Sequence, residues 1–168
     1  MNDTSSADLV EQVAQALLQR QWCMATAESC TGGLIAARCT GLAGSSAWFE
    51  RGFVTYSNAA KTELLGVPAA TIAQAGAVSE VVAQAMAEGA LRYSQAQVSV
   101  AVTGIAGPSG AVPGKPVGTV CLGWAVRSNP GADVASGTQR LQFTGDRAAV
   151  REATVSAALA QVLLMARG

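Results

Sequence analysis

The chain contains no histidine, and this absence restricts the chemistry open to it. Catalysis by Ser-His-Asp or Cys-His arrangements within the chain is excluded, because both require an imidazole base. Zinc sites commonly use histidine, and the four cysteines lack the CxxC spacing of an all-thiolate site. We therefore expect no metal and no other cofactor. A hydrolytic base would have to be lysine, aspartate, glutamate, tyrosine or a water molecule.

Clustered charge and long apolar runs are also missing. Lysine plus arginine and aspartate plus glutamate number 11 each, and the only lysines, Lys61 and Lys115, are the two candidates for a lysine base. Nucleic-acid binding depends mainly on neutralising phosphates with clustered cations, so we expect no nucleic-acid partner. No apolar run approaches the about 20 residues of a membrane span, and residues 1–7 are too polar for a signal peptide. We expect no membrane partner and a cytoplasmic location, where four cysteines would stay reduced: Cys23, Cys30, Cys39 and Cys121.

Aromatic residues make up only 5% of the chain, whereas half of it is hydrophobic, mainly alanine, valine and leucine. This composition favours helices packed closely on a sheet over an aromatic-rich β-sandwich. Apolar periodicity predicts helices over residues 8–19, 34–39, 58–65, 71–75, 80–93 and 147–165, and strands over residues 22–27, 48–56, 98–102, 117–126 and 138–143. We expect a single domain, residues 1–168, with a three-layer α/β/α architecture. The consecutive strands late in the chain indicate a mixed sheet.

Two glycine-rich turns follow predicted strands, at residues 29–33 (Ser-Cys-Thr-Gly-Gly) and 103–108 (Thr-Gly-Ile-Ala-Gly-Pro). Ligands of open α/β sheets bind beyond the carboxyl ends of the strands, so the two turns predict a shared cleft. Backbone amides and hydroxyls there can hold a phosphate or an oxyanion, although tight geometry alone also explains such glycines. The turn residues predicted to bind substrate are Thr31, Gly32, Gly33, Thr103, Gly104, Ala106 and Gly107.

Several single residues are further candidates. Lys61 lies one turn into a short predicted helix, whose N-terminal end lowers its proton affinity, and a neutral lysine can activate a serine. The same spacing is typical of a solvated surface lysine. Cys30, beside a helix N-terminus, is an alternative nucleophile. Arg147 opens the last helix and could reach an anion in the cleft, with Arg38 and Arg140 as weaker candidates.

Six motifs occur in order along nearly the whole chain: TAESCTGG at 26–33, GSSAWF at 44–49, GFVTYSN at 52–58, GAVSE at 76–80, TGIAGP at 103–108 and KPVGTV at 115–120. Together with Lys61, they resemble the C-terminal domain of competence/damage-inducible CinA proteins. The other, nucleotide-pyrophosphatase-like domain of that family is missing from this sequence. The chain therefore resembles the stand-alone members.

The resemblance implies a nicotinamide-nucleotide amidase of the pyridine nucleotide cycle, which converts nicotinamide mononucleotide to nicotinate mononucleotide and ammonia. It also implies a site of a serine, a tyrosine and a lysine, for which Tyr56 and Lys61 are the matching residues. The serine is Ser46 or Ser29, with Ser46 preferred as the nucleophile and Ser29 and Thr31 then binding the substrate. We expect a small nucleotide substrate and a homo-oligomer. The alternative is a non-catalytic nucleotide-binding module with a regulatory or partner role.

Overall fold

A five-stranded sheet with the order β2-β1-β3-β4-β5 forms the centre of the computed structural model, which describes residues 6–168. The strands are β1 (Met24–Glu28), β2 (Phe49–Val54), β3 (Val98–Gly104), β4 (Thr119–Val126) and β5 (Ala135–Gln142). β1 is parallel to both of its neighbours, β2 and β3, whereas β4 is antiparallel to β3 and to β5. The prediction of a mixed sheet is therefore confirmed. Residues 1–5 lie outside the described residues. The prediction that residues 1–7 are not a signal peptide falls mostly on this segment.

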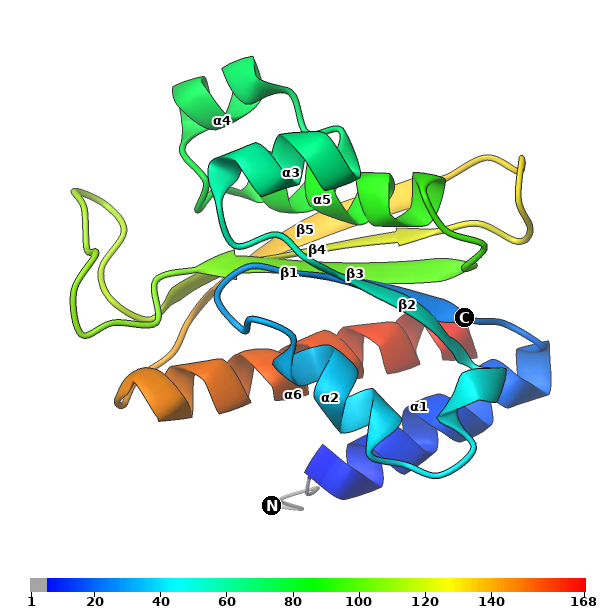
Figure 1. The fold of residues 1–168 in the computed structure, drawn as a ribbon. Coiled ribbons are helices and arrows are strands. Elements are labelled where there is room, and N and C mark those ends of the chain that lie inside the picture. The colour runs from blue at the N-terminus through cyan, green and yellow to red at the C-terminus, as the bar shows by residue number, and fades with distance from the viewer. Residues whose placement is uncertain (1–5) are drawn as a thin grey trace.

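Helices cover both faces of this sheet, which confirms the predicted three-layer architecture (Figure 1). One face carries α1 (Ser6–Arg20), α2 (Leu34–Thr40) and α6 (Arg147–Arg167); the other carries α3 (Asn58–Leu65), α4 (Ala69–Ala75) and α5 (Glu80–Arg92). A short 3-10 helix, η1 (Ser45–Ala47), precedes β2. The main error is in β5, which begins at Ala135 rather than at 138, because its first residues pair with the end of β4 without being apolar.

Strand alternation divides the core between the two helical layers. In β3, Val98, Val100 and Val102 join the core beneath α1 and α6, whereas Ala101 joins the core beneath α5. Small residues on the α5 side let that helix approach the sheet closely. At Gly123 in β4, an added Cβ would lie only 2.2 Å from the backbone oxygen of Ala83 in α5.

The last helix, α6, has the length and apolar composition of a membrane-spanning segment. This corrects the expectation that no part of the chain is long and apolar enough to span a membrane. It packs instead as a core helix. Val155, Leu159 and Val162 are fully buried against the sheet and α1, while Glu152 on the same helix forms an ion pair with Arg38 of α2. Its buried residues lie along one stripe, which is the pattern of a helix that covers one face of a folded domain.

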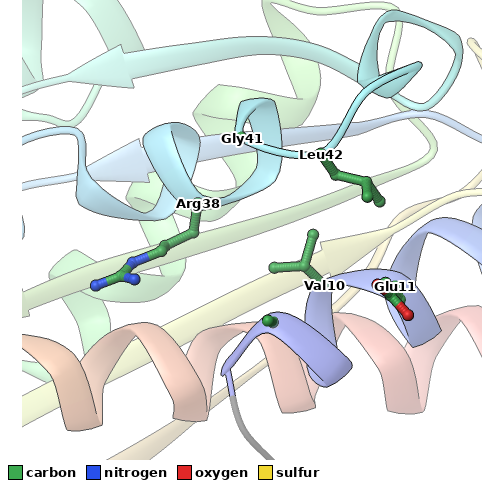
Figure 2. A pocket seen from close by; sticks show the side chains of 6 residues that line it. Val10, Glu11, Arg38, Gly41 and Leu42 are labelled. Atoms are coloured by element: carbon green, nitrogen blue, oxygen red, sulfur yellow. The ribbon is translucent and has the colours of Figure 1, made fainter.

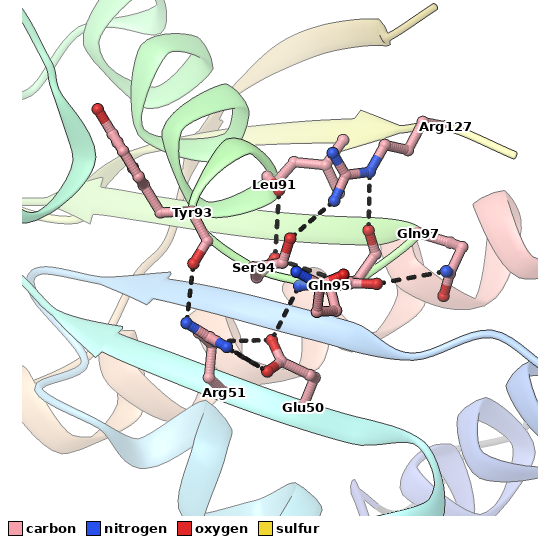
Figure 3. Close-up of polar contacts among 9 residues, drawn as sticks. Glu50, Arg51, Leu91, Tyr93, Ser94, Gln95, Gln97 and Arg127 are labelled. Carbon is pink, nitrogen blue, oxygen red and sulfur yellow. Dashed lines mark hydrogen bonds and ion pairs between the residues drawn. The ribbon is translucent and has the colours of Figure 1, made fainter. Parts of the chain in front are cut away.

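A polar network holds the sheet at the end where β2 and β3 begin (Figure 3). Arg51 of β2 pairs with Glu50 and donates to the backbone oxygen of Tyr93, and Glu50 accepts from the amide of Gln95. Arg127, just after β4, donates to two backbone oxygens of the same α5–β3 connection. This end of the sheet is therefore fixed by internal contacts, and the opposite end carries the candidate site.

Candidate active site

The carboxyl ends of β1, β2 and β3 meet at one edge of the sheet, where the loops that follow them and the start of α6 lie together (Figure 1). A cleft of about 210 Å³ opens there. Its lining comes from five separate parts of the chain: Ser29, Cys30, Tyr56, Asn58, Lys61, Ala77, Val78, Thr103, Gly104, Ala106 and Arg147. The predicted shared cleft therefore exists, and both glycine-rich turns border it.

A serine and a lysine meet inside this cleft. The Nζ of Lys61 lies 3.1 Å from the Oγ of Ser29, and the Lys61 residue is only 1% exposed. The other neighbours of Nζ are backbone oxygens, of Thr55 at 2.9 Å, Tyr56 at 3.4 Å and Ser57 at 3.5 Å. These can accept the two N–H bonds of a neutral amine, which leaves the lone pair free to face the serine hydroxyl.

The protonation of Lys61 follows from its surroundings. Burial removes water from the ammonium and lowers the pKa of Lys61 below its usual value. The ordinary alternative, a solvated surface lysine, does not describe this side chain. The fold itself thus shifts Lys61 toward the neutral form that a general base needs.

The turn that carries Ser29 is held in shape by a buried carboxylate. Glu28, the last residue of β1, is 1% exposed and accepts from the Thr31 hydroxyl at 2.6 Å and from the amides of Ile35 and Ala36 at 2.8 and 3.0 Å. It thereby satisfies amides at the start of α2, where a negative charge is favourable. Arg151 of α6 donates to the Thr31 backbone oxygen from outside the turn.

The predicted substrate-binding residues of the turns divide into two groups. Thr103, Gly104 and Ala106 line the cleft. The others are not among the lining residues: Thr31, Gly32, Gly33 and Gly107. Thr31 is fully buried and donates to Glu28, so its hydroxyl supports the turn and does not face a ligand. Gly32 and Gly33 are needed for shape, since their φ angles of 57° and 104° lie in the left-handed region.

Ser46 lies at the other end of β2 from Lys61. It belongs to η1, before the strand begins, and is exposed, whereas Tyr56 and Lys61 follow the end of the strand. The whole of β2 lies between the two positions. It has six residues and, at about 3.3 Å per residue, is about 20 Å long. This geometry contradicts the preference for Ser46 as the serine beside Lys61. Ser29 occupies that place.

Tyr56 and Arg147 meet at the mouth of the cleft. The Tyr56 residue is 62% exposed, and its hydroxyl lies 3.3 Å from an Arg147 nitrogen. A second Arg147 nitrogen donates to the Gly107 backbone oxygen at 2.9 Å. The weaker cationic candidates point elsewhere, because Arg38 pairs with Glu152 and Arg140 donates to the backbone oxygen of Gly114. Of the three arginines, Arg147 alone lines the cleft.

Cys30 also lines the cleft, but its thiol is poorly suited to act as a nucleophile. Burial raises its pKa to about 11, so the reactive thiolate is scarce near neutral pH. Within residues 6–168, no group of three or more cysteine, aspartate or glutamate side chains is placed to hold a metal ion. Of the serine and the cysteine in the cleft, Ser29 is the one whose side chain bonds Lys61.

Some residues of the site were not singled out from the sequence. Asn58, Ala77 and Val78 line the cleft, and Glu28 and Arg151 support the turn behind it. All except Arg151 fall within the motifs quoted above, which is the signal that could have identified them. A hydrophobic pattern gives no hint that Glu28 is buried, because a carboxylate at the end of a strand is usually exposed.

Another hollow, of about 170 Å³, lies between α1 and the end of α2 (Figure 2). Val10 and Leu42 face each other across it, and Arg38 and Glu11 border it. It holds no serine, lysine or cysteine. The chemistry is therefore concentrated in the cleft at the carboxyl edge of the sheet.

Fold and cleft together define a class: a three-layer α/β domain with a buried serine–lysine pair at the carboxyl edge of its parallel strands. The sequence model of the CinA C-terminal domain matches residues 6–166. The chain belongs to the CinA C-terminal domain family, as its motifs predicted.

Relatives of known name cover nearly the same length. The chain is 53% identical to the nicotinamide-nucleotide amidohydrolase PncC of Enterobacter agglomerans over 151 residues. The aligned region covers 90% of this chain and 89% of that protein. The chain is 51% identical over 159 residues to the protein of the same name from Escherichia coli K12, spanning 95% and 93%. The crystal structure of the competence damage-inducible protein A of Klebsiella pneumoniae superposes with a TM-score of 0.88 at 40% identity, over 95% of each chain.

Proposed function

We propose that this protein is a nicotinamide-nucleotide amidase that hydrolyses the carboxamide of nicotinamide mononucleotide to nicotinate mononucleotide and ammonia. The observation that carries the proposal is the 3.1 Å contact between Lys61 Nζ and Ser29 Oγ within a cleft. The names of the relatives supply the substrate, and the recycling of pyridine nucleotides toward NAD is the pathway in which this reaction fits. We propose the cytoplasm as its compartment, which suits the four free cysteines.

In the proposed mechanism, Ser29 is the nucleophile and Lys61 is the base. Neutral Lys61 takes the hydroxyl proton as Ser29 Oγ attacks the carboxamide carbon, and a tetrahedral oxyanion forms. Backbone amides of the glycine-rich turns stabilise that oxyanion. Lys61 then returns the proton to the nitrogen, the C–N bond breaks and ammonia leaves. Water, activated by Lys61, hydrolyses the serine ester and releases the acid.

The dimensions of the cleft suit one end of the nucleotide. Its volume of about 210 Å³ is below the roughly 300 Å³ at which pockets for drug-sized ligands begin. The pyridine ring and its carboxamide enter, and the ribose phosphate extends to the mouth. There Arg147 offers a cation for the phosphate. The Tyr56 hydroxyl bonds Arg147 and not Lys61, so we assign this side chain to substrate binding in place of a proton relay.

The test compares ammonia release by three variants of the purified protein. Ser29→Ala is expected to lose nearly all turnover and still bind the nucleotide. The matched control Ser46→Ala should retain normal turnover. Lys61→Arg retains the positive charge but cannot act as the base, so turnover should fall by about 100-fold or more. Lys115→Arg is its control, because Lys115 contacts the Ala75 backbone oxygen outside the cleft.

The outcomes separate the alternatives. Near-normal turnover in Ser29→Ala or Lys61→Arg would refute the serine–lysine mechanism. Loss of turnover in Ser46→Ala alone would restore Ser46 as the nucleophile. Nucleotide binding by the unmodified protein with no ammonia release would instead indicate the non-catalytic module.

A further inference from the structure

Thr103 lies directly beside Ser29 at the carboxyl edge of the sheet. The register of β1 and β3 pairs Glu28 with Val102, and the Ser29 amide donates to the Val102 backbone oxygen at 3.1 Å. Thr103 is therefore the neighbour of Ser29 on the next parallel strand, where adjacent strands are about 4.8 Å apart. The two residues also share a face of the sheet, since Ala27 and Ala101, two positions earlier, both pack beneath α5.

The hydroxyl of Thr103 has a fixed orientation. Its Oγ1 lies 2.9 Å from the backbone oxygen of Ala77, which can only accept a hydrogen bond. The hydroxyl hydrogen is therefore committed to Ala77, and the residue is only 1% exposed although it lines the cleft. With its hydrogen committed to Ala77, the Thr103 hydroxyl has only lone pairs left to offer a ligand in the cleft that it lines. A ligand group placed there must supply the donor.

We propose that Thr103 is a specificity-determining residue whose Oγ1 accepts an N–H of the scissile carboxamide and thereby favours the amide over the acid. This inference rests on the proposed function. An attacked carbon lies about 3 to 3.5 Å from Ser29 Oγ, and its nitrogen is one bond further away. Because Thr103 lies on the next strand, about 4.8 Å away, a nitrogen on that side of the attacked carbon is within reach of the Oγ1. A carboxamide has two N–H bonds to offer, whereas a carboxylate has none.

The same contact prepares the leaving group. With one N–H held by Thr103 and the C–O bond to Ser29 formed, the nitrogen lone pair is free to face Lys61. Lys61 delivers the proton taken from Ser29, the C–N bond breaks, and the nitrogen leaves as ammonia. Thr103 neither gives nor receives a proton, so its role is to orient the nitrogen.

After hydrolysis the contact between Thr103 and the ligand becomes repulsive. The product carboxylate brings negative oxygens against the lone pairs of Thr103, which weakens its binding. Turning the hydroxyl toward the carboxylate would leave the Ala77 oxygen without its donor, and unpaired buried polar groups are costly. The site therefore binds the acid less tightly than the amide, which favours release of the product.

The test measures dissociation constants by calorimetry for nicotinamide mononucleotide and nicotinate mononucleotide, in a Ser29→Ala background that prevents turnover. With Thr103 present, the amide nucleotide is expected to bind more tightly than the acid. Thr103→Val removes the acceptor at nearly constant size and should reduce the acid-to-amide ratio of dissociation constants by about 10-fold, the loss of one hydrogen bond. Thr103→Ser should restore the ratio. Thr154→Val is the control, since that buried hydroxyl bonds within α6.

A merely structural role for Thr103 would weaken both nucleotides together. An unchanged ratio in Thr103→Val, or a ratio that Thr103→Ser does not restore, would overturn this inference while leaving the amidase intact. Binding of neither nucleotide, together with no ammonia release by the unmodified protein, would refute the proposed function and this role with it.

Discussion

Replacing Glu28 with glutamine tests how the turn that carries Ser29 is stabilised. One carboxylate oxygen accepts from Thr31 Oγ1 and the Ile35 amide, and the other accepts from the Ala36 amide. In Glu28→Gln the side chain keeps one oxygen and places an NH₂ group against a backbone N–H. One charge-assisted hydrogen bond is lost and a buried donor is left unpaired. We expect unfolding to become easier by about 2–4 kcal/mol, a large share of the about 5–15 kcal/mol that stabilises a typical domain.

The measurement is urea denaturation followed by far-ultraviolet circular dichroism. Glu63→Gln is the matched control, because Glu63 is exposed and its change should stay within about 0.5 kcal/mol. We also expect Glu28→Gln to lower kcat in the ammonia assay, since Ser29 follows it directly. A stability equal to that of the control would refute the assignment of Glu28 as the charged acceptor of this turn.

Four other outcomes follow from the structure. Burial lowers the pKa of Lys61, and the base must be neutral, so kcat should rise with pH as Lys61 loses its proton and then level off, with a midpoint below that of a free lysine; a flat pH profile would contradict this. Arg147→Ala should raise KM for the nucleotide much more than for its dephosphorylated riboside, and equal effects would argue against a phosphate contact. The serine–lysine pair needs no metal, so activity should survive exhaustive chelation, and a loss reversed by one divalent cation would count against it. Gly123→Ala places a Cβ 2.2 Å from the Ala83 backbone oxygen, so thermal melting should show that the free energy of unfolding falls by about 1–3 kcal/mol or more. An unchanged stability would show that α5 can shift to make room.

Much of the fold could be predicted from hydrophobic spacing. The strand β3 is a continuous buried run, and α1 and α6 each show an apolar stripe, so pattern and structure agree there. The start of β5 was missed because Ala135 to Gly137 lie on an edge strand, where pairing with β4 and not burial defines the strand. Edge strands are only partly covered, so their sequence carries a weaker signal.

The site was predicted less completely, and the serine shows why. Both Ser29 and Ser46 lie in glycine-containing motifs, so residue type alone did not separate them. The order of elements did contain the answer. Ser46 precedes β2 and Lys61 follows it, so a single extended strand must keep them apart. The contact of Tyr56 with Arg147, in contrast, joins residues 91 positions apart and could not be read from local spacing.

The cleft draws its lining from residues 29–30, 56–61, 77–78, 103–106 and 147, which span most of the chain. No contiguous fragment contains it, so the binding site forms only when β1, β2, β3 and α6 have all come together. A nucleotide that binds only this assembled state acts as a probe of complete folding, because it withdraws molecules from the unfolded population. At a concentration 100 times its dissociation constant it would add about 2.7 kcal/mol to the stability of the native state.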